Sequence, residues 1–142
     1  MMSRFVSMSI TRRYLVIVCL LLLTACAPVY SPYVYDQTAS LKTEALALMR
    51  KAEEPYAKHA VKAERLMNDL LSLEQQEVLR KRNNAKVKQW QLLINDRGHL
   101  LGGFIHRWQT DTTLTETFIS LESRLVGEAF DLIQSTEKQR QP

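Results

Sequence analysis

Residues 113–132 read TLTETFISLESRLVGEAFDL and carry the clearest helical pattern in the chain. Apolar residues recur in this stretch at spacings of three and four, which places them on one face of an α-helix. The predicted apolar face consists of Phe118, Leu121, Leu125, Ala129 and Leu132. Thr113 followed by Glu116 is typical of a capping box, and Lys138 and Arg140 lie where the helix dipole favours positive charge. The sequence therefore predicts a long amphipathic helix here.

Shorter patterns of the same kind precede this helix. The first runs through Leu41, Ala45, Leu48 and Ala52, the second through Ala60, Ala63, Leu66, Met67, Leu70 and Leu73, and the third through Val87, Trp90 and Ile94. A further short segment holds Leu101, Phe104, Ile105 and Trp108. Pro55 should end the first helix near Glu53 or kink it, because proline removes a backbone donor and crowds the preceding turn. No stretch alternates with period two, so we expect an all-α fold, a small antiparallel helical bundle of three to five helices.

Four glycines and a pair of asparagines between and within these helices affect how they connect. Gly98 suits a left-handed helix end. Gly102 and Gly103 weaken the short segment and predict either close packing or movement, and Gly127 predicts a close helix contact. Asn83-Asn84 lies in a polar stretch that is either a turn or part of one long helix.

The N-terminal region has the three-part pattern of a secretory signal. Residues 11–26 read TRRYLVIVCLLLLTAC: two positive charges, an apolar run, then small residues. The strict apolar run, Tyr14 to Leu23, is about half of the roughly 20 residues that a spanning helix needs. Translation from Met1, Met2 or Met8 leaves a workable signal in each case. The alternative is an uncleaved anchor that continues to Val34.

Leu23-Thr24-Ala25-Cys26 resembles the lipobox of bacterial lipoproteins. The resemblance implies that the Cys26 thiol receives diacylglyceryl, that cleavage follows Ala25, and that the new amino group is acylated, commonly with palmitate. It also implies a location at the periplasmic face of the outer membrane if the host is Gram-negative, because Ala27 is not the aspartate of an inner-membrane retention signal. In another host the anchor would lie in the cell membrane. The other cysteine, Cys19, is in the apolar run, so the mature body has no disulfide.

These patterns divide the chain into a signal peptide (residues 1–25), a lipidated cysteine with an extended tether (26–35), and an α-helical domain (36–142). The tether is expected to be extended because Pro28 and Pro32 lie where a helix would have to run. Its tyrosines either rest at a lipid interface or cover the first helix. These are Tyr30, Tyr33 and Tyr35.

The charge balance argues against a nucleic-acid partner. The whole chain has a formal net charge of +4, but three of its 19 Lys and Arg residues precede Cys26, which leaves 16 basic against 15 acidic residues in the mature chain. Only a local cluster then favours an anionic ligand or partner, such as lipid phosphates or the acidic groups of peptidoglycan. It consists of Arg80, Lys81, Arg82, Lys86 and Lys88. The alternative is a solvated helix face.

No set of residues predicts catalysis, a cofactor or a metal. His59 is expected to be a surface imidazole, while His99 and His106 are two helical turns apart, about 10 Å, which is too far for one zinc ion. Glu53, Glu54, Asp111 and Glu116 are the carboxylates considered for sugar hydrolysis, and nothing marks a cleft between them. The aromatic residues Trp90, Phe104 and Trp108 form either core or a partner-binding patch.

We therefore expect a non-catalytic lipoprotein, held at the membrane by its N-terminal lipid, that is a binding or structural component of a cell-envelope assembly with a protein partner. The alternatives are a protein that binds or acts on peptidoglycan and a carrier of a small apolar ligand, which would need an interior pocket.

Overall fold

The computed structural model describes residues 30–80 and 84–139, in which there are five α-helices and no β-strand. The all-α prediction is confirmed. The elements are α2 (Pro32–Met49), the 3-10 turn η2 (Tyr56–Lys58), α3 (Ala60–Leu79), α4 (Asn84–Ile94), α5 (Leu101–Asp111) and α6 (Glu116–Lys138).

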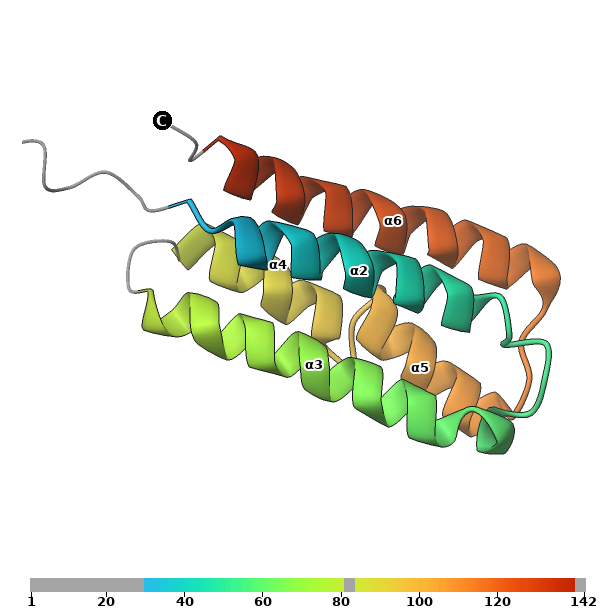
Figure 1. Cartoon of the computed structure of the whole chain (residues 1–142). Coiled ribbons are helices and arrows are strands. Elements are labelled where there is room, and N and C mark those ends of the chain that lie inside the picture. Colours follow the sequence, from blue (N-terminus) through green and yellow to red (C-terminus); the bar gives the residue numbers. More distant parts are fainter. Residues whose placement is uncertain (1–29, 81–83, 140–142) are drawn as a thin grey trace, which may run out of the picture.

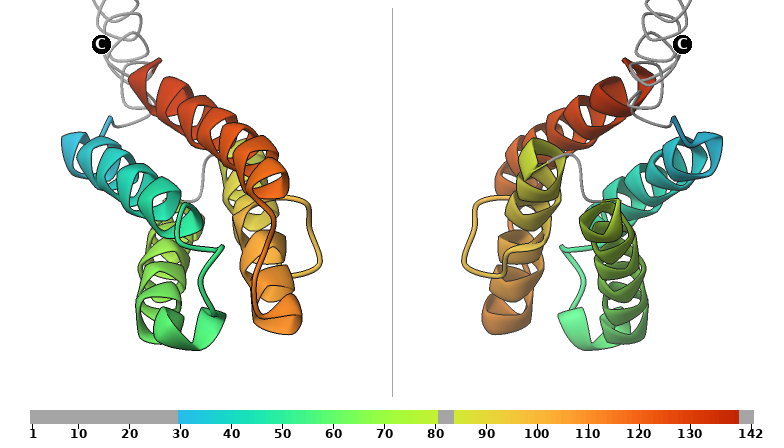
Figure 2. Two further views of the ribbon diagram at one scale, coloured as in Figure 1. Left: turned by 90° about the vertical axis from the view of Figure 1, so that its right-hand side faces the viewer. Right: turned by 90° about the vertical axis from the view of Figure 1, so that its left-hand side faces the viewer.

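The helices form a four-column antiparallel bundle, in which α4 and α5 follow one another along a single column (Figure 1). Helix α2 packs against α3 and α6, and α4 packs against the same two helices from the other side, so α3 and α6 lie diagonally opposite (Figure 2). We call the end that holds Pro32 and Lys138 the proximal end and the opposite one the distal end. The proximal end brings together the start of α2, the end of α3, the start of α4 and the end of α6.

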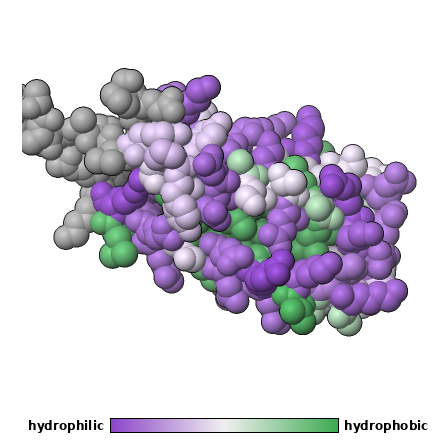
Figure 3. All heavy atoms as spheres, in the orientation of Figure 1, coloured by the Kyte–Doolittle hydropathy of each residue, from purple (hydrophilic) through white to green (hydrophobic). Residues whose placement is uncertain are grey.

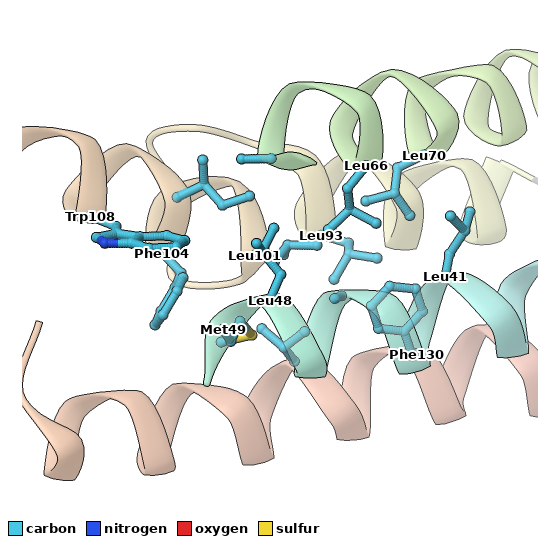
Figure 4. Close-up of a cluster of buried hydrophobic side chains, with 14 of the residues drawn as sticks. Leu41, Leu48, Met49, Leu66, Leu70, Leu93, Leu101, Phe104, Trp108 and Phe130 are labelled. Carbon is cyan, nitrogen blue, oxygen red and sulfur yellow. The ribbon is translucent and has the colours of Figure 1, made fainter. Parts of the chain in front are cut away.

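The apolar core runs along the bundle and receives side chains from all five helices (Figure 4). The stripe predicted for the first helix is buried in full, at Leu41, Ala45, Leu48 and Ala52. The three aromatic residues left open above are also buried, so they belong to the core. These are Trp90, Phe104 and Trp108.

The buried face of α6 differs from the predicted one. It consists of Ile119, Val126, Phe130 and Ile133, together with Gly127 and Glu137. Leu121 and Leu132, predicted to be buried, are each about half exposed. The helix also begins later, because Thr115 and not Thr113 is the N-cap, and its hydroxyl accepts a hydrogen bond from the Phe118 N–H at 3.4 Å. The capping box prediction is therefore wrong.

Helix α2 begins inside the segment predicted to be extended. Its N-cap is Ser31, whose hydroxyl accepts from the Val34 N–H at 3.3 Å. Pro32 follows in the first turn, where the missing N–H costs no helical hydrogen bond. The extended tether is thus wrong for residues 32–35, and residues 26–29 lie outside the described part of the chain.

The linkers decide the other open points. Helix α3 ends at Leu79 and α4 begins at Asn84. Of the two alternatives for the polar stretch around Asn83-Asn84, one long helix is therefore excluded. Helix α2 ends at Met49, earlier than the predicted Glu53, and Pro55 lies in the linker that follows. Gly98 does not have the positive φ of a left-handed helix end, so that prediction is wrong. Among the described residues, the one with a positive φ is Thr112, at 69°.

Two backbone hydrogen bonds close the distal end. They join the linker after α2 to the linker after α5: the Tyr56 N–H donates to the Thr112 carbonyl at 2.9 Å, and the Leu114 N–H donates to the Ala52 carbonyl at 2.8 Å.

Glycine allows the start of α5 to pack against the end of α4. A Cβ added at Gly102 would lie 2.2 Å from the Ile94 carbonyl oxygen, and one at Gly103 would lie 1.9 Å from the Gly98 carbonyl oxygen. At Gly127 an added Cβ would meet only side-chain atoms, at 3.9 Å. The close contact predicted for Gly127 is therefore wrong, and of the two alternatives left open for Gly102 and Gly103 the structure shows close packing.

These contacts predict opposite effects for two glycine-to-alanine changes. Gly102→Ala forces the Ile94 backbone to move, and we expect it to lower the free energy of unfolding by about 2 kcal/mol. Gly127→Ala has room and gains helix propensity, so it should raise that free energy by up to about 1 kcal/mol. Urea unfolding followed by circular dichroism measures both. Equal effects of the same sign would contradict the packing described here.

Candidate functional site

A lysine ammonium group lies in the interior at the proximal end. Lys86, on the first turns of α4, has no exposed surface, and its Nζ donates to Glu77 Oε1 at 3.3 Å and to Glu137 Oε2. Glu77 on α3 and Glu137 on α6 are each only 1% exposed. Charges are buried at this depth only when opposite charges and hydrogen bonds replace water.

Two further groups add to this arrangement. Arg80, at the end of α3, donates through Nη1 to Glu77 Oε1 at 2.7 Å and to Glu137 Oε1 at 3.3 Å. The backbone N–H of Ser31, the N-cap of α2, donates to Glu137 Oε1 at 2.8 Å. We call Glu77, Arg80, Lys86 and Glu137 the charge cluster. Together with Ser31 it connects all four columns of the bundle at one level.

The charge cluster shifts the pKa values of two of its members. Burial by itself raises the pKa of Glu137, but the hydrogen bonds from Lys86 and the Ser31 N–H and the two nearby positive charges outweigh it and hold the pKa below the ordinary value of 4.5. For Arg80, burial lowers the pKa, and the bonds and charges of Glu77 and Glu137 raise it above its usual range. Both groups are therefore charged at neutral pH.

The structure places the predicted basic residues in different environments. Lys86 is in the interior, so its assignment to an exposed surface is wrong. Arg80 is partly exposed and bonded to two carboxylates. Lys88 is exposed, whereas Lys81 and Arg82 lie outside the described residues, as does Cys26.

The acidic partners of Lys86 were missed, although the sequence holds a signal for them. Glu77 continues the buried spacing of Leu70 and Leu73 on α3, and Glu137 follows Ile133 four residues later on α6. On α4, Lys86 precedes the buried Trp90 by four residues. Three charged residues thus occupy core positions at the ends of three helices.

His59 is held in place and is not a solvated imidazole. Its side chain is 12% exposed, its Nε2 lies 3.3 Å from Glu54 Oε2, and its ring packs on Trp108 with ring centroids 5.5 Å apart. The pKa of Glu54 is lowered, chiefly by the hydrogen bond to His59. His99 and His106 are both exposed; His99 precedes α5 and His106 lies on it.

A groove lies between α2 and α6 toward the distal end, with a volume of about 510 Å³. It is lined by Leu46, Arg50, Glu53, Glu116, Ile119, Ser120, Ser123 and Arg124. The lining thus combines two apolar side chains, two arginines and two glutamates. None of these four charged side chains forms an ion pair with another described residue. The groove is therefore able to bind groups of both charges around an apolar contact.

A second, smaller cavity of about 270 Å³ lies between α2 and α3 and is mainly basic. Lys51, His59, Lys62 and Arg65 line it together with Glu44. Arg65 donates to Glu44 at 2.9 Å, and Lys51 lies 3.7 Å from Glu54, so part of this charge is already neutralised. Sequence spacing could not reveal either cavity, because each one is built from two helices.

Within residues 30–80 and 84–139, no three His, Cys, Asp or Glu side chains converge to form a possible metal site. None of the helices described there combines the length and hydropathy that crossing a bilayer requires. Comparisons with protein-family models, curated proteins and solved structures found no match for this chain.

Removal of Lys86 should strongly destabilise the bundle. Lys86→Met leaves Glu77 and Glu137 buried with less compensating charge, and we expect the free energy of unfolding to fall by about 3 to 5 kcal/mol. Lys88→Met, an exposed position on the same helix, should change it by less than about 0.5 kcal/mol. Chemical denaturation of the two variants gives the comparison. Similar losses of unfolding free energy in the two variants would contradict a stabilising role of the buried Lys86 in the charge cluster.

The lowered pKa of Glu137 predicts a loss of stability in acid. A carboxylate with a depressed pKa stabilises the folded state above its unfolded value of 4.5, and this contribution is lost as the pH falls through the folded pKa. Melting temperatures should therefore decline below about pH 4.5. Glu137→Gln should flatten this decline from a lower starting stability, whereas Glu128→Gln, exposed on the same helix, should keep the slope of the parent protein.

Proposed function

We propose that this protein is a lipid-anchored envelope protein that acts without catalysis, as a binding or structural component of a cell-envelope assembly. The observation that carries the proposal is the position of Cys26. It stands in a lipobox directly behind an apolar run, and five residues later the chain enters the bundle at Ser31. The Ser31 N–H donates a hydrogen bond to Glu137, which connects the start of the bundle to the charge cluster.

A lipid on Cys26 would hold the folded body close to the membrane. Five residues span at most about 18 Å even when fully extended. The proximal end would therefore face the membrane, and the groove between α2 and α6 would lie on the part of the bundle farthest from it. With Ala27 after the cysteine, the proposed membrane is the outer one in a Gram-negative host, with the body in the periplasm.

The groove supports a binding role better than a chemical one. Arg50 and Arg124 reach it from different helices, and arginine forks bind carboxylates with two parallel hydrogen bonds. Leu46 and Ile119 supply apolar contact between them. A partner segment that carries acidic groups beside an apolar side chain fits this lining. Peptidoglycan is the second candidate partner, because its peptides also carry carboxylates that Arg50 and Arg124 can bind.

In-cell photo-cross-linking tests the proposal. A photoreactive residue at Ser120, in the groove, should form an adduct with a discrete envelope protein. One at Asn68, exposed on the diagonally opposite α3, should not. With residues 1–26 replaced by a cleavable secretory signal that has no lipobox, the protein should leave the membrane fraction and the Ser120 adduct should weaken.

The outcomes separate the parts of the proposal. Retention of the protein without its lipobox segment in carbonate-washed membranes would contradict lipid anchoring. A lipidated protein with no Ser120 adduct would contradict the groove, and an adduct that stays with the sacculus in hot detergent would favour peptidoglycan as the partner.

A further inference from the structure

The proximal end exposes large apolar side chains around the charge cluster. Leu79, in the last turn of α3, is 77% exposed, and Val78 beside it is about half exposed. Tyr33, in the first turn of α2, is 59% exposed. Figure 3 shows a hydrophobic group over this end of α3, with hydrophilic side chains next to it.

The charge cluster brings these side chains to one end of the molecule. Arg80, the neighbour of Leu79, and Ser31, two residues before Tyr33, both donate to the same oxygen of Glu137. Leu79 and Tyr33 are therefore each within two residues of a donor to the same carboxylate oxygen, although 46 positions separate them in the sequence. The chain leaves the bundle toward Cys26 from the same place.

We infer that this end rests in the membrane interface, with Leu79, Val78 and Tyr33 in contact with lipid, so that the bundle stands on the bilayer. The inference rests on the proposed function, since the anchor supplies the membrane. Leucine and valine gain from leaving water, and a tyrosine ring with its polar tip is well accommodated at the interface. The lipid at Cys26 holds them within reach of it, so the occupant of this surface is the bilayer itself.

Two other arrangements at the membrane would place the two ends of α3 differently. If the bundle lay flat on the membrane, or moved freely above it, both ends of α3 would be at similar distances from lipid. Val61 is 80% exposed near the other end of α3 and is an aliphatic side chain like Leu79. The two positions are 18 residues apart on one helix, which corresponds to about 27 Å.

Single-cysteine labels measure this difference in the full mature lipoprotein. The body has no cysteine of its own after Cys26, whose thiol carries lipid, so Leu79→Cys and Val61→Cys each accept one environment-sensitive fluorophore. The proteins are reconstituted into phosphatidylethanolamine–phosphatidylglycerol vesicles with brominated acyl chains. We expect quenching of the label at position 79 to exceed that at position 61 by roughly two-fold or more, because interfacial side chains lie about 5–10 Å into the boundary. Tyr33→Cys should behave like Leu79→Cys.

Each other result overturns the inference. Equal quenching at positions 79 and 61, or stronger quenching at 61, excludes an upright bundle. A label at position 79 that is shielded from water yet unquenched shows that protein covers this surface, from a second copy or from another segment. Mass spectrometry of Cys26 on the same sample distinguishes failure of the proposed function: an unmodified cysteine removes both claims, whereas lipidated Cys26 with an unquenched label at 79 removes only this one.

Discussion

The buried ammonium group of Lys86 constrains how the four columns can be placed. It is stable in the interior only while Glu77 of α3 and Glu137 of α6 face it, and Glu137 in turn binds the first turn of α2 through Ser31. Sliding any one column by a turn, about 5.4 Å, would separate these groups and leave charges without compensation. Apolar side chains tolerate such shifts far better, because their contacts have no direction. The charge cluster therefore sets the longitudinal register of the bundle.

The two ends are held by different interactions, and this difference has a consequence for the chain outside the bundle. At the distal end, neutral backbone hydrogen bonds join the linkers, and Tyr56 and Phe104 pack against Trp108. At the proximal end, the charge cluster fixes Ser31 directly. A lipid five residues upstream of Ser31 would therefore connect to a defined point on a rigid body. Exposed Leu79 and Tyr33 lie around that same point.

The sequence predicts the helices because apolar residues recur at helical spacing in each of them, but it predicts their buried faces unequally. On α2 the row predicted from its spacing, through Leu41 and Leu48, is the one that the structure buries, although apolar residues such as Leu46 lie beside it. On α6, two adjacent rows have helical spacing, one through Leu121 and Leu132 and one through Ile119 and Phe130. Only the position of the neighbouring helices selects the second row. The start of α2 was missed for another reason: Pro32 was interpreted as excluding a helix, when the first turn accepts proline.

The candidate sites could be predicted only in part, because each needs several helices at once. Lys86 was identified as a basic residue, but its burial follows from core positions on α3, α4 and α6 that carry opposite charges and meet at one level. That coincidence is visible only when the registers of all three helices are known together. The groove is similar, since Arg50 and Arg124 are remote in sequence and share a surface through the antiparallel pairing of α2 and α6.

The proposed anchoring also explains why a shallow, charge-balanced groove would be sufficient for binding. Ion pairs in contact with water contribute at most about 1 kcal/mol each, so Arg50, Glu53, Glu116 and Arg124 would give weak affinity for a partner free in solution. A short tether changes this, because it confines the groove to a layer no deeper than the tether plus the length of α6, whose 23 residues extend about 35 Å. A partner held in the same layer would meet the groove at a higher effective concentration than one free in solution. Weak contacts then become adequate, and a groove of balanced charge avoids strong attraction to the anionic surfaces beside it.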